Sequence, residues 1–218
     1  MKKLVVFGNG EQAEVAGYLF ECGDEYEVIA YTVDKEFNKG EFCNKESVDF
    51  ETVEQIFPPG EYEMFVAIGY SGMNQLRRDK YEKAKAKGYK LASYISPAAH
   101  TFPDFNCGEN CLILEMNNIQ PFVKIGNNVT LWSGNHIGHH TIIEDDVFMT
   151  SHVVVSGGVK IGKGSFLGVN ATLRDHIEIG ERTLIASGTM ITKNTEAEGV
   201  YMGVPAKLRS MKSTELKI

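Results

Sequence analysis

The sequence predicts an α/β plus all-β chain: a small Rossmann-like N-terminal domain followed by a left-handed parallel β-helix. An alternation of strand and helix patterns in the first half predicts the α/β domain, and a six-residue period in the second half predicts the β-helix. We therefore expect residues 1–95 to form the first domain. Residues 96–218 should form the second, with a C-terminal cap, and no long linker separates the two.

The six-residue period begins at residue 113, and at every sixth position a large apolar side chain recurs. The positions are Ile113, Ile119, Ile125, Leu131, Ile137, Ile143, Met149, Val155, Ile161, Leu167, Leu173, Ile179, Ile185 and Ile191. Glycine often follows this anchor, where a tight turn needs a residue without a β-carbon. Neither a helix nor an amphipathic strand has a period of six. Each hexad is therefore expected to form one short strand and one turn, with its anchor inside a triangular prism.

The first half alternates apolar runs with amphipathic ones. The runs that predict strands cover residues 3–7, 28–33, 64–68 and 89–95. The helical patterns cover residues 12–22 and 73–87, and the polar segment 34–60 carries weak signals. This alternation predicts a small parallel sheet, which would bind a ligand beyond the carboxyl ends of its strands.

Glycine and polar residues follow three of these strands. The predicted substrate-binding residues at the strand ends are Gly8, Asn9, Gly10, Asp34 and Gly69. Gly8-x-Gly10-x-x-Ala13 is a truncated dinucleotide fingerprint, and its alternative interpretation is a plain strand-to-helix turn. Asp34 follows Gly10 by nearly the number of residues at which that fingerprint places its acidic, ribose-binding residue. The alternative is that Asp34 contacts a nucleobase or a sugar hydroxyl. Half of a dinucleotide fold favours a nucleotide-linked substrate over NAD.

The candidate catalytic residue is a histidine on the prism. Three hexads make one coil, so residues 18 apart stack on adjacent coils about 4.8 Å apart. His139 lies two places after an anchor, at an outward-facing turn, and it stacks on Gly157, which has no side chain. An imidazole has the basicity of a general base near neutral pH, and a backbone N–H beside it can hold an oxyanion. We therefore predict that His139 is the base of an acyl transfer.

The partner that orients His139 is left open by the sequence. His136 and His140 are interpreted as solvated turn residues or as residues of a subunit interface. The acidic turn at residues 144–146 either supplies a carboxylate partner or is an ordinary solvated turn. The four cysteines show no metal spacing, so no metal site is predicted.

The C-terminal part offers residues that suit a phosphate-bearing cofactor. Ser187 and Gly188 allow close backbone approach, and Lys193, Lys207 and Arg209 are cations near the last coil. The alternative is a C-terminal cap with ordinary surface charges. The predicted cofactor-binding residues are Gly157, Ser187, Gly188, Lys193, Pro205 and Lys207.

The chain resembles the bacterial hexapeptide-repeat sugar acyltransferases of the sialic acid O-acetyltransferase (NeuD-like) family. It is similar above all to members that N-acetylate nucleotide-linked amino sugars. The resemblance covers essentially the whole chain. It is carried by residues 6–10, 66–69 and 156–162, by His139, and by the Gly-Val-Pro-Ala-Lys ending at residues 203–207.

The resemblance implies a homotrimer with acetyl-CoA in the groove between adjacent prisms and a nucleotide sugar held by the N-terminal domain. His139 matches the family's base, Gly157 matches the amide that contacts the acetyl carbonyl, and residues 8–10, Asp34 and Gly69 match the sugar-nucleotide pocket. The sequence departs from the family pattern at His140, where a carboxylate is common. It also departs at the first turn, which usually reads Gly-x-x-Gly-His.

The resemblance therefore implies an acetyl-CoA-dependent N-acetyltransferase that acts on a nucleotide-linked amino-deoxy sugar, such as a dTDP- or UDP-4-amino-4,6-dideoxy hexose. Its pathway would be surface polysaccharide biosynthesis, as in the lipopolysaccharide O-antigen. O-acetylation of a sugar of the sialic acid type is the alternative. A weakly supported His139 favours N-acylation, because an amine that arrives deprotonated needs a weaker base than a hydroxyl.

The net charge and the length of the apolar runs indicate the kind of partner and the location of the protein. A net charge of -7 argues against nucleic acid and anionic membranes, and no apolar run is long enough for a membrane helix, so we expect a cytoplasmic enzyme. A zinc lyase of the γ-carbonic-anhydrase kind, with His100, His136 and His140 as ligands, is a distant alternative. The N-terminal domain and the Gly-Val-Pro-Ala ending argue against it. A non-catalytic scaffold would not bind CoA.

Overall fold

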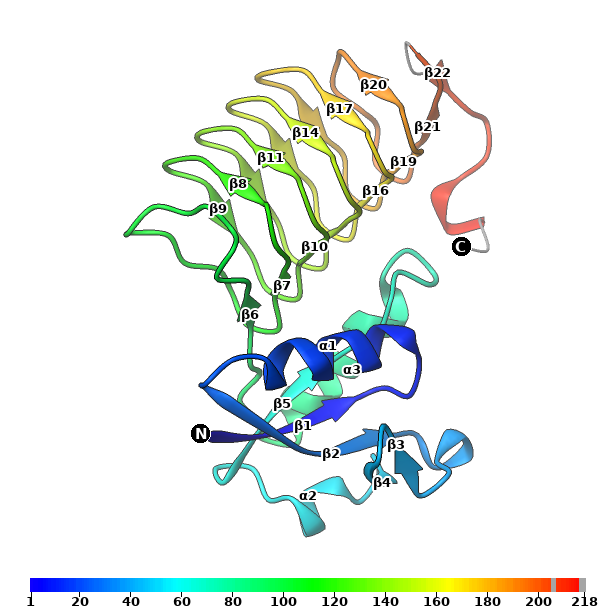
Figure 1. Cartoon of the computed structure of the whole chain (residues 1–218). Helices are drawn as coiled ribbons and strands as arrows, with labels where there is room; N and C mark the ends of the chain where they lie inside the picture. The colour runs from blue at the N-terminus through cyan, green and yellow to red at the C-terminus, as the bar shows by residue number, and fades with distance from the viewer. Residues whose placement is uncertain (205–206, 216–218) are drawn as a thin grey trace. The chain divides into compact units, whose positions relative to one another are not determined.

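The computed structural model describes residues 1–204 and 207–215, and the chain divides into two compact units (Figure 1). The first unit comprises Met1–Gly69 and Leu76–Tyr94. The second comprises Tyr70–Gln75 and Ile95–Ile218, so a short internal segment belongs to the later part of the chain.

The first unit is an α/β domain built on a five-stranded sheet in the order β3-β4-β2-β1-β5. Its elements are β1 (Lys2–Phe7), α1 (Glu11–Glu21), β2 (Tyr26–Val33), the 3-10 helix η1 (Lys35–Phe37), β3 (Glu41–Phe42), β4 (Lys45–Asp49), α2 (Val53–Ile56), β5 (Tyr62–Val66) and α3 (Gln75–Ala86). The strands are parallel except for β3, which runs antiparallel to β4. β1 lies in the interior of the sheet, and Leu4 to Phe7 are all buried, as expected for a strand covered on both faces.

Three details differ from the sequence-based expectation. β3 and β4 arise within the polar segment 34–60, where periodicity gave little signal. Residues 89–95 do not form a fourth strand of this sheet, because Leu91 makes only an isolated bridge to Met64 while β6 (Tyr94–Ile95) joins a prism sheet. Helix α3 begins at Gln75, because Met73 and Asn74 have positive φ angles and interrupt a helical path.

The second unit is a left-handed parallel β-helix whose coils stack into a triangular prism (Figure 1). After β6, its strands are β7 (Leu112–Ile113), β8 (Asn118–Ile119), β9 (Lys124–Ile125), β10 (Thr130–Leu131), β11 (His136–Ile137), β12 (Ile142–Ile143), β13 (Phe148–Met149), β14 (Val154–Val155), β15 (Lys160–Ile161), β16 (Phe166–Leu167), β17 (Thr172–Leu173), β18 (Glu178–Ile179), β19 (Leu184–Ile185), β20 (Met190–Ile191), β21 (Val200–Met202) and β22 (Lys207–Leu208).

These strands form three sheets. The first prism sheet has the order β22-β21-β19-β16-β13-β10-β7-β6, the second β20-β17-β14-β11-β8, and the third β18-β15-β12-β9. Partners on adjacent coils are 18 residues apart, as in the pairing of Thr130 with Phe148. The stacking worked out from the hexads is therefore confirmed.

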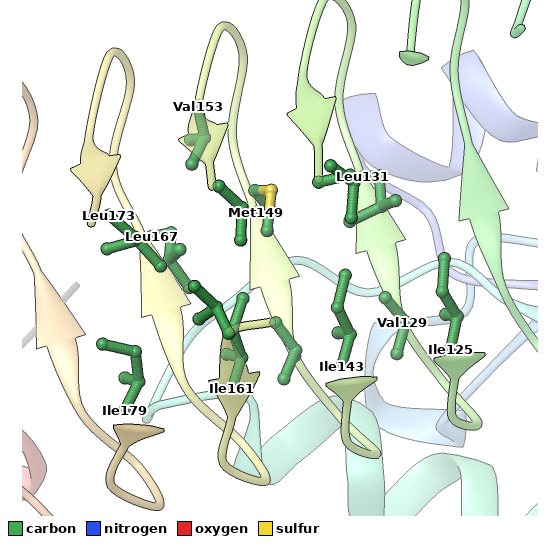
Figure 2. Packing of buried hydrophobic residues seen from close by; sticks show 14 of the residues in the cluster. Ile125, Val129, Leu131, Ile143, Met149, Val153, Ile161, Leu167, Leu173 and Ile179 are labelled. Atoms are coloured by element: carbon green, nitrogen blue, oxygen red, sulfur yellow. The ribbon is translucent and has the colours of Figure 1, made fainter. Parts of the chain in front are cut away.

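The anchors of the hexads fill the prism. All of them, from Ile113 to Ile191, are buried and belong to one apolar cluster, and Figure 2 shows several of them stacked along the interior. Cys111 lies in the same cluster and Cys107 packs against it, and neither of these two described residues forms a disulfide bond. Burial of one large aliphatic side chain per hexad stabilises the prism by roughly 1.5–3 kcal/mol each.

Left-handed residues turn the chain at each corner of the prism. Asn128 and Asp146 both have positive φ, and both are buried. The Asn128 amide donates to Asp146 Oδ1 at 2.8 Å and accepts from the Asn110 amide at 2.8 Å. Short polar side chains tolerate this conformation, and here the amide ladder satisfies them inside the fold.

Segment Tyr70–Gln75 packs on the outer face of the first prism sheet. The Tyr70 ring contacts the rings of Phe148 and Phe166, with centroids 5.0 and 4.8 Å away. Asn74 donates to the carbonyls of Gly164 and Ser165. Beyond the last coil, the 3-10 helix η2 (Ser213–Glu215) contacts the prism through the Ser213 N–H, which donates to the Glu198 carbonyl at 2.9 Å. Among the described residues, no helix has the length and apolar character needed to cross a membrane.

Candidate active site

His139 lies in the turn between β11 and β12. Because β11 belongs to the second prism sheet and β12 to the third, this turn is a corner of the prism. We call the stacked turns 120–123, 138–141, 156–159 and 174–177 the His139 corner. The His139 side chain is exposed, and its backbone carbonyl accepts from the Gly158 N–H at 2.8 Å. The backbone of His139 is therefore held by the next coil, and its imidazole is open to a ligand.

The next coil places a glycine against this imidazole. A β-carbon built on Gly157 would lie 2.6 Å from His139 Cε1 and 2.7 Å from His139 Nε2, so the ring occupies the space that a side chain would need. Within the described part of the chain, the backbone N–H of Gly157 donates to no acceptor. An unused N–H beside a basic nitrogen is the arrangement that general-base catalysis with oxyanion stabilisation requires.

His140 is the residue that contacts the His139 ring. The two Nδ1 atoms are 3.1 Å apart and the ring planes are nearly perpendicular. His140 has a positive φ of 59°, and its ring packs against Phe122 of the preceding coil with centroids 4.7 Å apart. His140 is thus an exposed turn residue, and its ring also contacts the candidate base.

The acidic turn, which the sequence left as a possible partner, lies at a different corner. Residues 144–146 connect β12 of the third prism sheet to β13 of the first. Asp145 accepts from the Asn127 N–H at 2.7 Å, Asp146 belongs to the buried amide ladder, and Glu144 pairs with Lys160 at 3.0 Å. The hydrogen bond to Glu144 raises the pKa of Lys160. These carboxylates hold the turn together and supply no partner to His139.

The predicted cofactor residues lie at other places on the prism. Ser187 and Gly188 form an exposed turn between β19 and β20, at the corner that joins the first and second prism sheets. A β-carbon on Gly188 would meet nothing within 4 Å, so its backbone is open to a ligand. Lys193 follows β20 and Lys207 begins β22, and both are exposed. Pro205 lies outside the described residues.

The predicted substrate residues gather at one edge of the α/β sheet. β2, β1 and β5 are neighbours, so their carboxyl ends place Asp34, the turn at residues 8–10, and Gly69 side by side. Gly8 has a φ of +136°, and a β-carbon there would lie 2.8 Å from the Ala67 carbonyl oxygen. Gly10 and Gly69 face open space. The Asn9 amide donates to the Phe37 carbonyl at 3.1 Å.

Asp34 has a partner that the sequence did not reveal. Both of its carboxylate oxygens lie 2.5 Å from Lys80 Nζ, and the Lys80 side chain is only 9% exposed. The ammonium also lies 5.4 Å from the Phe7 ring centroid and 5.7 Å from that of Phe50. Lys80 is one of several lysines on a charged helix, so no local signal could single it out.

The remaining histidines are dispersed over the prism. His136 pairs within the second prism sheet with Asn118 and Val154, and His100 bridges to Asn118 on the same sheet. His152 lies over Gly134 at another corner. Among residues 1–204 and 207–215, no group of three or more His, Cys, Asp or Glu side chains is placed to hold a metal ion.

Comparison with known proteins relates the repeats to transferases. Residues 122–157 and 158–193 match the family described as "Bacterial transferase hexapeptide (six repeats)". A bifunctional protein GlmU from Thermodesulfovibrio yellowstonii is 37% identical over 123 residues, which is 46% of this chain and 27% of that protein. The chain spans between about a quarter and a half of the length of the curated relatives that it matches first.

Solved structures share the fold over almost the whole chain. The acetyltransferase domain of PglB from Neisseria gonorrhoeae in complex with acetyl coenzyme A superposes with a TM-score of 0.85 at 22% identity, covering 95% of this chain and 99% of that one. A perosamine N-acetyltransferase variant from Caulobacter crescentus in complex with CoA and GDP-perosamine gives 0.70 at 24% identity, covering 96% and 97%. Residues 122–193 thus carry the hexapeptide repeat of bacterial transferases, and the chain as a whole has the two-domain fold of left-handed β-helix acetyltransferases.

Proposed function

We propose that this protein transfers an acetyl group from acetyl-CoA to the amino group of a nucleotide-linked amino-deoxy sugar. The observation that carries the proposal is the pairing of an exposed, outward-facing imidazole with an unused backbone N–H, at His139 and Gly157. The fold supports it, because the similar N. gonorrhoeae domain binds acetyl coenzyme A and the similar C. crescentus enzyme binds GDP-perosamine.

The chemistry follows from the two groups at the corner. His139 Nε2 accepts a proton from the substrate amine as the nitrogen lone pair forms a bond to the thioester carbonyl carbon. The Gly157 N–H donates to the carbonyl oxygen as that oxygen gains negative charge. When the carbon–sulfur bond breaks, the proton held on His139 passes to the departing thiolate. The products are an amide and CoA, and His139 returns to its neutral form.

The acetyl-CoA site would use Gly157, Ser187, Gly188, Lys193, Pro205 and Lys207. Gly157 and Ser187 lie at different corners of one prism, so a single copy presents them on different edges. A groove between two prisms, in which one copy contributes the His139 corner and its neighbour contributes the other corner, would bring them to one ligand. This geometry supports a homotrimer, which analytical ultracentrifugation would detect as a species of three times the chain mass.

The nucleotide sugar would bind at the carboxyl ends of β1, β2 and β5. Gly10 and Gly69 leave open backbone there, and the pair of Asp34 and Lys80 supplies both an acceptor and a donor. Amine acylation is favoured over hydroxyl acylation because the residue beside His139 is an imidazole rather than a carboxylate. An amine that binds in its neutral form needs only a modest base.

The test compares acceptors and one histidine variant. Purified protein is assayed for CoA release with dTDP-, UDP- and GDP-linked amino sugars, with the matching hydroxy sugars, with sialic acid and with serine. His139→Asn should lower kcat by roughly 100-fold or more on the best amino sugar, the range typical of a lost general base. His100→Asn, a histidine two coils before His136 on the same prism sheet, is the control.

Two results would contradict the proposal. Unchanged kcat in His139→Asn would remove His139 as the base. Preferred acylation of a hydroxyl or of serine would assign a different substrate class to the same fold. Calorimetry with CoA distinguishes these two outcomes from a non-catalytic scaffold, because a scaffold would not bind CoA.

A further inference from the structure

The His139 corner holds a second imidazole in a fixed position. His140 Nδ1 lies 3.1 Å from His139 Nδ1, which is hydrogen-bond distance between two ring nitrogens. The backbone N–H of His140 donates to the Pro121 carbonyl at 3.2 Å, and its ring packs on Phe122. Both the main chain and the ring of His140 are therefore held by the preceding coil.

Two nitrogens at this distance share one proton. If both carried hydrogen, two N–H groups would point at each other. If neither did, two lone pairs would face each other. When the shared proton belongs to His139, its Nε2 is bare and can act as a base. When it belongs to His140, His139 carries its own proton on Nε2 and cannot accept one.

The other groups at this corner do not compete for His139 Nδ1. Phe122 and Pro121 on the preceding coil are apolar. On the following coils, His176 lies over Gly158, and Asp175 is exposed with its carboxylate 3.7 Å from Arg174. Among the described residues, His140 is the side chain whose polar atom lies within hydrogen-bond distance of the His139 ring, so it decides where the proton sits.

We propose that His140 is the positioning residue of the site: it accepts the hydrogen bond from His139 Nδ1–H and so presents a bare Nε2 to the substrate. The inference rests on the proposed function, in which His139 is the base. A neutral acceptor also stabilises the imidazolium less than a carboxylate would, so it suits transfer to an amine.

Residues at other left-handed turns of the prism guide the choice of substitutions for His140. Phe122 occupies the same corner position one coil earlier with a positive φ of 67°, and Asn170 has a φ of 60° in another left-handed turn. His140→Phe therefore keeps an aromatic ring on Phe122 without an acceptor. His140→Asn removes the ring but places the amide oxygen at the branch position that Nδ1 occupied.

The kinetic test uses the best amino-sugar substrate. His140→Phe should lower kcat by roughly 10- to 100-fold, as removal of an orienting partner commonly does, with little change in KM. His140→Asn should restore most of kcat. His140→Glu should keep activity but shift the acidic limb of the kcat/KM profile to higher pH by about one unit, because a carboxylate favours the imidazolium. Equal kcat in His140→Phe and wild type would overturn the proposal.

A second readout does not depend on activity. Two-dimensional ¹H–¹⁵N NMR of the full-length protein distinguishes the two neutral tautomers of each imidazole, and His139→Asn assigns the signals. Wild type and His140→Asn should show His139 with hydrogen on Nδ1, and His140→Phe should show the Nε2–H tautomer. If wild type shows Nε2–H, the positioning role is wrong even where the enzyme acetylates amino sugars. If the tautomers behave as expected but no amino sugar is acetylated, the proposed function fails instead.

Discussion

The imidazole of His139 occupies the space where a side chain on Gly157 would stand. A β-carbon at Gly157 would come within 2.6 Å of Cε1, 2.7 Å of Nε2 and 3.1 Å of Nδ1 of that ring. Stacking at 18 residues makes the two positions neighbours, and only a residue without a side chain leaves the imidazole room to lie there. The absence of one methyl group therefore helps to create the candidate site.

Gly157→Ala is expected to displace the His139 ring by about the size of a methyl group. Misplacement of a catalytic group by about 1 Å costs roughly 100-fold in rate, so kcat should fall to that extent. Circular dichroism and Tm should stay close to wild type, because the ring can swing outward into solvent. Gly23→Ala, whose β-carbon would meet only the Phe20 carbonyl at 3.7 Å, is the control for a harmless alanine. Full activity in Gly157→Ala would show that the ring is not used where it lies.

Alanine substitutions at Gly8 and Gly10, both in the strand-to-helix turn of the α/β domain, should differ in their effect on stability. Gly8→Ala places a β-carbon 2.8 Å from the Ala67 carbonyl oxygen and 2.9 Å from the Ala13 β-carbon, at a φ of +136°. Strain and overpacking together should cost roughly 2–5 kcal/mol of unfolding free energy. At Gly10 the same substitution meets nothing within 4 Å and should leave stability nearly unchanged. Urea unfolding of both variants measures the difference, and equal midpoints would refute this account.

The ion pair of Asp34 and Lys80 should contribute to the stability of the α/β domain. Asp34→Asn leaves the buried ammonium of Lys80 without its anion and should cost roughly 1–3 kcal/mol. Lys80→Met keeps the apolar stem between Phe7 and Phe50 and removes the charge. Because the two groups are partners, the double variant should lose less than the sum of the single variants. A strictly additive result would mean that the contact has no energetic weight.

The same pair also tests the proposed sugar-nucleotide site. If the pair contacts the substrate, both single variants should raise KM for the nucleotide sugar while KM for acetyl-CoA stays constant. Unchanged KM in both would place the nucleotide elsewhere.

Alkaline pH should weaken the α/β domain through Tyr26. Burial raises the pKa of Tyr26, and a hydrogen bond that its hydroxyl donates to Glu63 at 2.8 Å raises it further, to about 12. Because the pKa of Tyr26 is higher in the folded state than in the unfolded state, the protonated hydroxyl stabilises the fold. This contribution is complete below the ordinary tyrosine pKa, near 10, and is lost as pH rises through about 12. Tyr26→Phe should therefore flatten the decline of stability between pH 10 and 12. Denaturant unfolding across that range measures the slope, and identical slopes would contradict the assignment.

Much of the prism follows from the sequence alone. One large side chain in every sixth position specifies the interior, because each coil must bury its anchors against those above and below. The same period fixes the 18-residue stacking and hence the contact of His139 with Gly157. The parallel strands β1, β2 and β5 could also be predicted, because their apolar runs are long and bounded by glycine or polar residues.

Short or non-local features escaped prediction. β3 and β4 lack an apolar run, and the segment near Leu91 is apolar but pairs at only one bridge. The contact between Lys80 and Asp34 joins residues far apart in the chain, and the charged helix gives no clue as to which lysine turns inward.

The sequence by itself determined the coil, its register and the exposed corner that carries His139, because a strict six-residue period leaves a single way to bury the anchors. Only the tertiary structure decided which group stands beside that imidazole. The acidic turn and His140 are both close to His139 along the chain, but the triangular path sends the carboxylates around the next corner and leaves His140 with its Nδ1 3.1 Å from that of His139.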